Sequence, residues 1–282
     1  MILITGGDGQ LGSCLKETLK QYKMDVVAPG IERMNIINPK ETAQFFEKYS
    51  PDAVVHCAAF SQVDLAEDES AACTETNVYG TQVIADLCRE KGIYLLYIST
   101  DYVFDGKKTG AYETFDIKNP LSVYGKSKSD GEDIVLSASS NNAVLRTSWL
   151  FGHAQNNFAE AILRKAQKSP MLHVVCDQIG SPTYTEDLAK LIVEILNKRC
   201  AGIYHATNEG ICSWAQFARK ILAETGVEAQ VTEISSQMYG AKATRPQNSV
   251  LSKKSLDDMG LNRLPHWEDA LRRYLTKRER IK

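Results

Sequence analysis

The chain has 282 residues, of which 43% are apolar, so it is long enough for one large domain with a substantial core. Its 33 basic and 35 acidic residues nearly balance, without the basic block expected of a nucleic-acid-binding protein. No apolar run approaches the roughly 18 residues of a membrane span, and the first residues form a strand pattern rather than a signal peptide. Seven cysteines without a Cys-x-x-Cys pair favour free thiols and a cytoplasmic location, with no metal site.

The N-terminus predicts a nucleotide-binding turn. Met1–Thr5 is a short apolar run typical of a buried parallel strand, and a glycine-rich turn follows it at once. Gly6, Gly9 and Gly12 are spaced three apart, and Leu11 opens a helical pattern. Strand, glycine turn and helix start are the context of a dinucleotide site, because the helix N-terminus holds phosphates. The alternative is an ordinary strand–helix turn.

The second predicted strand, Asp25–Ala28, bears on the choice of cofactor. Its end reads Pro29-Gly30, without the acid that usually binds a ribose 2′-hydroxyl in NAD-selective sites. Arg33 follows shortly and is suited to a 2′-phosphate. The pattern favours NADPH, or use of both NADPH and NADH.

Strands and helices then alternate along the chain, which predicts an α/β fold with a doubly wound parallel sheet of the Rossmann type. After about residue 150 the pattern loosens. We therefore expect a dinucleotide-binding region over 1–150 and, over 151–282, a smaller substrate-binding lobe interleaved with the last strands of the sheet. The later strands are predicted at Ala53–His56, Tyr94–Ile98, Ala143–Thr147, Leu172–Val175 and Ile203–His205, and the helices at Glu41–Tyr49, Ala71–Glu90, Ser122–Ser137, Asn156–Lys168, Thr185–Asn197, Trp214–Glu224 and from Trp267.

A catalytic site is predicted at the carboxyl ends of these strands, because ligands of such sheets bind there. Tyr124 and Lys128 are four apart on a predicted helix, so they share one face. An ammonium there favours the phenolate and lowers the tyrosine pKa. Thr100 ends a strand and offers a hydroxyl to a substrate carbonyl beside that phenol. Tyr-x-x-x-Lys alone is not specific, and Lys126 stands nearby at the wrong spacing.

Several longer motifs together resemble those of the dTDP-4-dehydrorhamnose reductases, a family of extended short-chain dehydrogenase/reductases. The resemblance covers nearly the full length. The motifs are Gly9-Gln10-Leu11-Gly12, Ala58-Ala59-Phe60-Ser61-Gln62-Val63-Asp64, Ser99-Thr100-Asp101-Tyr102-Val103-Phe104-Asp105-Gly106, Val123-Tyr124-Gly125-Lys126-Ser127-Lys128, Arg146-Thr147-Ser148-Trp149, Asp177-Gln178-Ile179-Gly180-Ser181-Pro182-Thr183 and Arg245-Pro246-Gln247-Asn248-Ser249.

The resemblance implies an NAD(P)H-dependent reduction of a sugar-nucleotide C4 keto group, the last step of dTDP-L-rhamnose synthesis. Tyr124 would be the general acid, Lys128 would bind the nicotinamide ribose, and Thr100 would hydrogen-bond the reacting oxygen. Asp101 and Trp149 would contact the substrate. The implied cofactor contacts are Gly9, Gln10 and Leu11 at the pyrophosphate, Asn35 and Ile36 beside adenine, and Ala59, Phe60, Ser61 and Ile98 along the groove.

Some positions leave alternatives open. Trp149 also suits a core position, and Arg245 is either a surface charge or a bidentate ligand of a nucleotide diphosphate. Some bacterial members of the family dimerise around Mg²⁺ through a Glu at the position of Cys14, a poor ligand for that ion. We therefore expect a monomer, or a homodimer that is not bridged by a metal ion.

Two groups of residues resemble metal ligands but have simpler interpretations. The acids Asp64, Glu67, Asp68 and Glu69 suit the start of a helix better than a metal site. The histidines His56, His173 and His205 suit the core or the edge of a sheet better than a role as ligands.

Two rival functions remain. A 4-epimerase or 4,6-dehydratase would share this fold, but the dehydratases of this superfamily carry an Asp-Glu pair where this chain has Asp101-Tyr102. A regulatory subunit resembling that of methionine adenosyltransferase would bind the dinucleotide and a partner chain without turnover.

Overall fold

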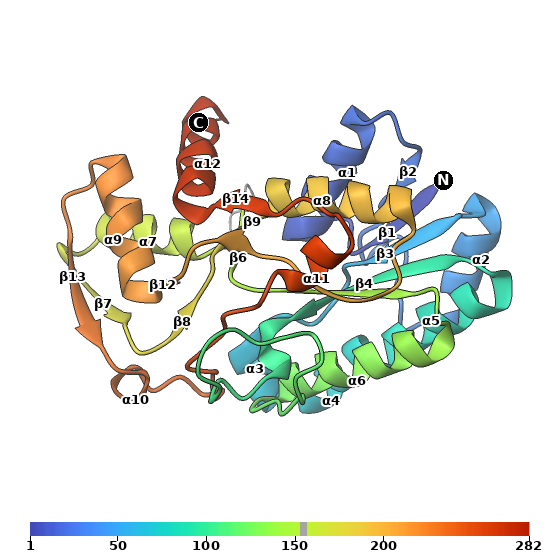
Figure 1. The fold of residues 1–282 in the computed structure, drawn as a ribbon, viewed down its shortest axis with the longest axis horizontal. Helices are drawn as coiled ribbons and strands as arrows, with labels where there is room; N and C mark the ends of the chain where they lie inside the picture. The colour runs from blue at the N-terminus through green and yellow to red at the C-terminus, as the bar shows by residue number, and fades with distance from the viewer. Residues whose placement is uncertain (153–156, 282) are drawn as a thin grey trace.

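The centre of the molecule is a six-stranded parallel sheet, in a computed structural model that describes residues 1–152 and 157–281 (Figure 1). The strand order is β10-β5-β4-β3-β1-β2, and every neighbouring pair is parallel. This confirms the predicted doubly wound sheet. The strands are β1 (Ile2–Thr5), β2 (Val26–Val27), β3 (Ala53–His56), β4 (Tyr94–Thr100), β5 (Ala143–Thr147) and β10 (Gly202–His205).

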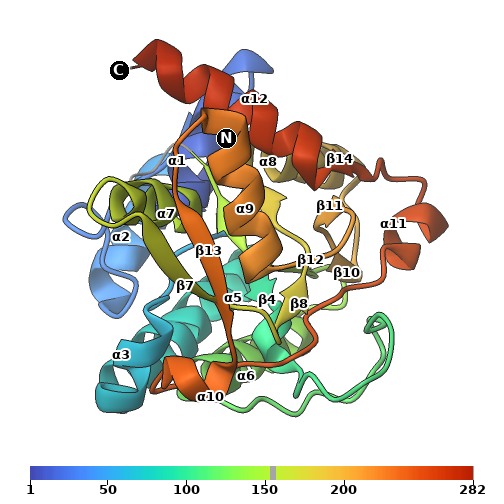
Figure 2. The ribbon, with the colours of Figure 1, turned by 90° about the vertical axis from the view of Figure 1, so that its left-hand side faces the viewer.

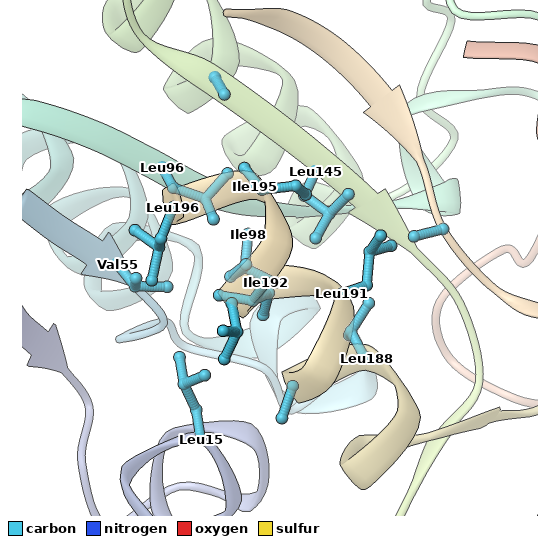
Figure 3. Packing of buried hydrophobic residues seen from close by; sticks show 14 of the residues in the cluster. Leu15, Val55, Leu96, Ile98, Leu145, Leu188, Leu191, Ile192, Ile195 and Leu196 are labelled. Atoms are coloured by element: carbon cyan, nitrogen blue, oxygen red, sulfur yellow. The ribbon is translucent and has the colours of Figure 1, made fainter. Parts of the chain in front are cut away.

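Helices cover both faces of this sheet, because its strands are apolar on both sides. One face packs against α1 (Gln10–Gln21) and α8 (Thr185–Lys198), and Leu96 and Leu145 of the strands share one core with Ile192 and Ile195 of α8 (Figure 3). The opposite face packs against three helices whose side chains share a second core with Leu3, Val54 and Tyr97. These helices are α2 (Pro39–Tyr49), α5 (Gly80–Lys91) and α6 (Val123–Ala138).

The start of α6 is set by a side-chain cap. The Ser122 hydroxyl accepts a hydrogen bond from the Gly125 amide at 3.1 Å, which satisfies one of the free amides of the first turn. Tyr124 consequently lies in the first turn of α6, and Lys128 lies one turn later.

The predicted helix over 71–90 is interrupted. It consists of α4 (Ser70–Thr74), a π-helical turn η1 (Glu75–Tyr79) and α5, in unbroken succession. A π-turn adds one residue to the helix, and such turns are frequent at functional sites. Here it carries Asn77, which is buried beneath the end of β3. The expectation of one regular helix was wrong at this turn.

A smaller unit surrounds a separate aromatic core. Its strands and helices face the viewer in Figure 2. It contains a parallel pair of strands, β7 (Met171–Val175) and β13 (Gln230–Ile234). Helices α7 (Phe158–Ala166), α9 (Trp214–Thr225) and α12 (Trp267–Ile281) pack around them; the predicted start of α7 at Asn156 lies outside the described residues. Because α8 packs on the main sheet and β10 is one of its strands, the two units are interleaved in sequence. The division of the chain at residue 150 stays a prediction.

Short elements complete the chain, and no described helix is long and apolar enough to cross a membrane. They are α3 (Val63–Asp68), the 3-10 turn η2 (Asp101–Val103), β6 (Leu150–Phe151), β8 (Ile179–Gly180), β9 (Thr183–Tyr184), β11 (Asn208–Glu209), β12 (Cys212–Ser213), α10 (Ser236–Tyr239), α11 (Lys254–Asp258) and β14 (Leu264–His266).

A buried ion pair joins α6 to the sheet. Glu132 accepts hydrogen bonds from Nε and Nη2 of Arg146 on β5, both at 2.8 Å, and neither side chain reaches solvent. The same carboxylate accepts a hydrogen bond of 2.5 Å from the Ser99 hydroxyl on β4. Three elements therefore meet at one carboxylate.

Replacing this carboxylate should destabilise the protein strongly. Glu132→Ala leaves the Arg146 guanidinium buried without its counter-ion, which costs about 3–5 kcal/mol of unfolding free energy. Urea unfolding followed by circular dichroism measures it, with Asp258→Ala, an exposed carboxylate, as the control. A loss below about 1 kcal/mol would contradict a role for this pair in joining α6 to the sheet.

Candidate active site

A cleft of about 890 Å³ opens at the carboxyl ends of the strands, between the two units. Part of its lining comes from segments predicted to meet at the strand ends, namely the glycine turn, the loop after β3 and the end of β4. They include Gly6, Asp8, Gly9, Gln10, Leu11, Gly12, Gly30, Asn35, Ile36, Ala59, Ser61, Ile98, Thr100, Asp101, Tyr124, Lys128, Trp149 and Trp214.

The glycine turn allows backbone to approach the cleft closely. Gly6 has a φ of +67°, and a Cβ on Gly12 would lie 2.2 Å from the Gly6 carbonyl oxygen. Gly9 caps α1 without a side chain, so the first amides of this helix have no side-chain cap. The buried Nε2 of Gln10 likewise has no hydrogen-bond partner among the described residues. These donors fit the phosphates of a dinucleotide.

A buried histidine fixes the loop that follows β3. His56 Nδ1 lies 2.6 Å from the Thr5 hydroxyl, which also accepts a hydrogen bond from the Ala58 amide. On its other side, His56 Nε2 lies 3.0 Å from the hydroxyl of Thr81, which donates to a backbone carbonyl. This pattern requires a neutral ring with its proton on Nε2. Burial, with Lys128 nearby, lowers the pKa of His56 to about 3, in line with the core role.

Asn77, which the sequence analysis did not single out, clamps the loop after β3 to α6. Its Oδ1 accepts a hydrogen bond of 2.7 Å from the Phe60 amide, and its Nδ2 donates to the Phe60 carbonyl at 3.1 Å. Nδ2 also donates to the Ser127 hydroxyl at 2.9 Å, one residue before Lys128. The only signal in the sequence was a polar residue on the inner face of an apolar helix pattern.

The predicted catalytic residues come together in the cleft. Thr100, Asp101 and Lys128 are buried, while Tyr124 is half-buried at the cleft wall. The Thr100 hydroxyl donates to Asp101 at 3.0 Å and accepts a hydrogen bond from the Tyr102 amide at 3.2 Å. The Lys128 ammonium lies over the Tyr97 ring, 4.0 Å from its centroid.

The pKa of Tyr124 differs from the expectation that Lys128 lowers it. Burial, followed by the Asp101 carboxylate, raises the Tyr124 pKa above its usual range, and the Thr100 hydrogen bond offsets this only in part. Burial also lowers the Lys128 pKa to about 7, so this ammonium is partly neutral near neutral pH. Desolvation is therefore the largest cause of the pKa shift of both groups.

Two predicted contacts are not among the residues that line the cleft. The Phe60 backbone is held by Asn77, and Arg245 binds Asp64 of α3 through two hydrogen bonds of 3.0 and 2.7 Å. Arg245 therefore joins the two units at this edge. Its role at a diphosphate, and that of Phe60 at the cofactor, stay predictions.

An aromatic pair forms the far wall of the cleft. Trp149 has a φ of +49°, and its ring stacks on Trp214 with 3.5 Å between ring centroids. Gly180 makes this packing possible, because a Cβ there would lie 2.7 Å from the Trp149 ring. Trp214 was missed in the sequence, since its partner is 65 residues away and no local pattern connects them.

The acidic cluster on α3 forms contacts within the protein. Asp68 pairs with Lys242, and Glu67 accepts a hydrogen bond from the Val123 amide at 2.9 Å. Within residues 1–152 and 157–281, no three His, Cys, Asp or Glu side chains are arranged to hold a metal ion. Cys14 is half-buried, and desolvation raises the pKa of its thiol.

Comparison with known proteins agrees with this geometry. The sequence profile described as RmlD substrate binding domain matches residues 1–280. The spore coat polysaccharide biosynthesis protein SpsK of Bacillus subtilis (strain 168) is 41% identical over 98% of this chain and 97% of its own. A dTDP-4-dehydrorhamnose reductase of Aggregatibacter actinomycetemcomitans is 37% identical over 96% and 97%. The dTDP-4-dehydrorhamnose reductase of Bacillus anthracis str. Ames, solved in complex with NADP, superposes with a TM-score of 0.95 at 36% identity, covering 98% of each chain. The chain therefore belongs to the RmlD family.

Proposed function

We propose that this chain reduces the C4 keto group of dTDP-4-dehydro-L-rhamnose to dTDP-L-rhamnose with NADPH or NADH, the last step of dTDP-rhamnose synthesis. The observation that carries this proposal is the meeting of Thr100, Tyr124 and Lys128 in the cleft that the glycine turn lines. The activities of the relatives named above support the same reaction.

The cofactor supplies the hydride, and the chain supplies its binding site. We infer that the amides at the start of α1 and the Gln10 side chain hold the pyrophosphate, because these donors are free and face the cleft. Asn35 and Ile36, which line the same cleft, would contact the adenine. The groove between them and Lys128 is lined by Ala59, Ser61 and Ile98, with the Phe60 backbone held behind it.

Tyr124 delivers the proton. Its raised pKa keeps the phenol protonated at neutral pH, so a proton is available when negative charge develops on the C4 oxygen. Thr100 orients that oxygen through its hydroxyl. Lys128 would position the nicotinamide ribose, and its pKa of about 7 lets it gain or lose a proton near neutral pH.

The substrate contacts belong to the second unit and the adjoining strand ends. Asp101 and Trp149 line the cleft beside Tyr124, and these positions suit contacts to the sugar. Arg245 would have to release its ion-pair partner Asp64 before it could bind a diphosphate. We expect a monomer or a homodimer without a bridging metal, working in the cytoplasm.

A non-catalytic regulatory subunit is the second candidate, because such a subunit keeps the same fold. The presence of Thr100 and Tyr124 in one cleft favours the enzyme, since binding alone does not need a proton donor at this position. Failure to reduce any sugar nucleotide, with a synthetase co-purifying, would favour the subunit.

Removal of the phenol should abolish most turnover. Tyr124→Phe keeps the ring but not the proton, so kcat should fall about 10²–10⁴-fold. Loss of absorbance at about 340 nm, a property of the reduced nicotinamide, reports turnover with dTDP-4-dehydrorhamnose. Tyr22→Phe, the same change at an exposed site, is the control and should keep full activity. Near-normal turnover by Tyr124→Phe would refute the assigned role.

The buried carboxyl of Asp101 makes stability depend on pH. Burial raises the Asp101 pKa to about 6, although hydrogen bonds from Ser249 and Thr100 oppose the shift. Because the folded protein binds this proton more tightly than the unfolded chain, the contribution of Asp101 is present below about pH 4. It is lost as the pH rises through about 6.

Asp101→Asn should therefore gain stability relative to the parent chain as the pH rises. The difference in unfolding free energy should shift by roughly 2–3 kcal/mol between pH 4 and pH 7 in favour of the variant. Chemical denaturation at several pH values measures it. Asp258→Asn, at an exposed carboxyl, is the control. A difference for Asp101→Asn that does not change with pH would contradict the raised pKa.

A further inference from the structure

The glycine turn packs directly against the end of β2. The Gly7 amide donates a hydrogen bond to the Pro29 carbonyl at 2.9 Å. A Cβ on Gly7 would lie 2.3 Å from the Ala28 carbonyl oxygen, so only glycine permits this approach. As a result, the next residue of the turn, Asp8, stands over the tip of β2.

The Asp8 carboxylate occupies the place where a side chain at position 30 would begin. A Cβ built on Gly30 would lie 1.5 Å from Asp8 Oδ2 and 2.5 Å from its Cγ. Both residues line the cleft, together with Ile31 and Asn35. The sequence has no acid at the end of β2, but Asp8, which is 22 positions before Gly30, places a carboxylate there in the folded protein.

The tip of β2 is where the adenosine ribose lies in dinucleotide-binding folds, and a carboxylate there accepts hydrogen bonds from the 2′-hydroxyl. A 2′-phosphate at the same point would face that negative charge. Lys128 and Arg164 are the only Lys or Arg side chains among the described residues of the cleft, and they belong to α6 and α7. Arg33 is exposed and does not line the cleft.

We propose that Asp8 selects against the 2′-phosphate, so that this chain binds NADH in preference to NADPH. This inference rests on the proposed use of a nicotinamide cofactor and adds its specificity. Since the site is open to solvent, the repulsion weakens NADPH binding without preventing it, by about 5–10-fold relative to NADH.

Cofactor titration without any sugar substrate tests the proposal. The fluorescence of NADH and NADPH on binding gives two dissociation constants and their ratio for each protein. Asp8→Asn removes the charge at nearly constant shape and should lower the preference for NADH about 5–10-fold, mainly by tightening NADPH. Gly30→Ala should act in the same direction, because its methyl group displaces the carboxylate.

Two neighbouring variants serve as controls. Glu32→Gln removes an exposed negative charge outside the cleft and should leave the ratio unchanged. Arg33→Gln tests the alternative that this arginine holds the 2′-phosphate. Selective weakening of NADPH by Arg33→Gln, or a ratio unchanged by Asp8→Asn, would overturn the proposal.

Ionic strength provides an independent check. The NADH preference of the parent chain should shrink as salt is raised, whereas that of Asp8→Asn should stay flat. The titration is separate from the proposed reaction: a chain that fails to reduce dTDP-4-dehydrorhamnose but still discriminates through Asp8 would refute the reaction and keep this inference. Equal binding of both cofactors by the parent chain would refute the inference and leave the reaction untouched.

Discussion

The contact between Arg146 and Glu132 is the interaction on which the geometry of the site depends. A charge pair in an apolar interior is tolerated only when every polar atom is satisfied, and here the guanidinium also donates to the Thr114 carbonyl and bonds His205 on β10. Ser99 completes the set through the Glu132 carboxylate. Since Ser99 precedes Thr100 and Glu132 lies one helical turn after Lys128, the pair holds the two halves of the proposed catalytic group at a constant separation.

The two ends of the cleft differ in whether backbone or side-chain groups line them. The phosphate end consists of glycines and helix amides, whose positions follow from the strand–turn–helix path alone. The reactive end consists of buried polar side chains, and there the desolvation that raises the pKa of Asp101 to about 6 also destabilises the fold once that carboxyl ionises. Buried polar groups with complete hydrogen bonding, such as His56 and Asn77, hold the loops at that end in place.

Much of this could be predicted from the sequence, because strands, the glycine turn and the Tyr124–Lys128 helix depend on local patterns. What escaped prediction depends on pairs distant in sequence. The π-helical turn exists to bury Asn77 against the loop after β3, and no periodicity indicates one added residue. The partner of Arg245 is 181 residues away. Burial likewise reversed the expected direction of the Tyr124 pKa, since no spacing rule reports how far a phenol is removed from water.

The place of β10 in the sheet has a consequence for synthesis of the chain. β5 is fully buried, and its outer edge pairs with Gly202–His205. During translation, the first 150 residues therefore emerge with a hydrophobic strand whose amides and carbonyls are unpaired, a surface prone to pairing with other chains. Its partner strand leaves the ribosome more than 50 residues later. A ribosome-bound chain is thus exposed to aggregation over this interval, and folding of the dinucleotide-binding region is completed by sequence that follows it.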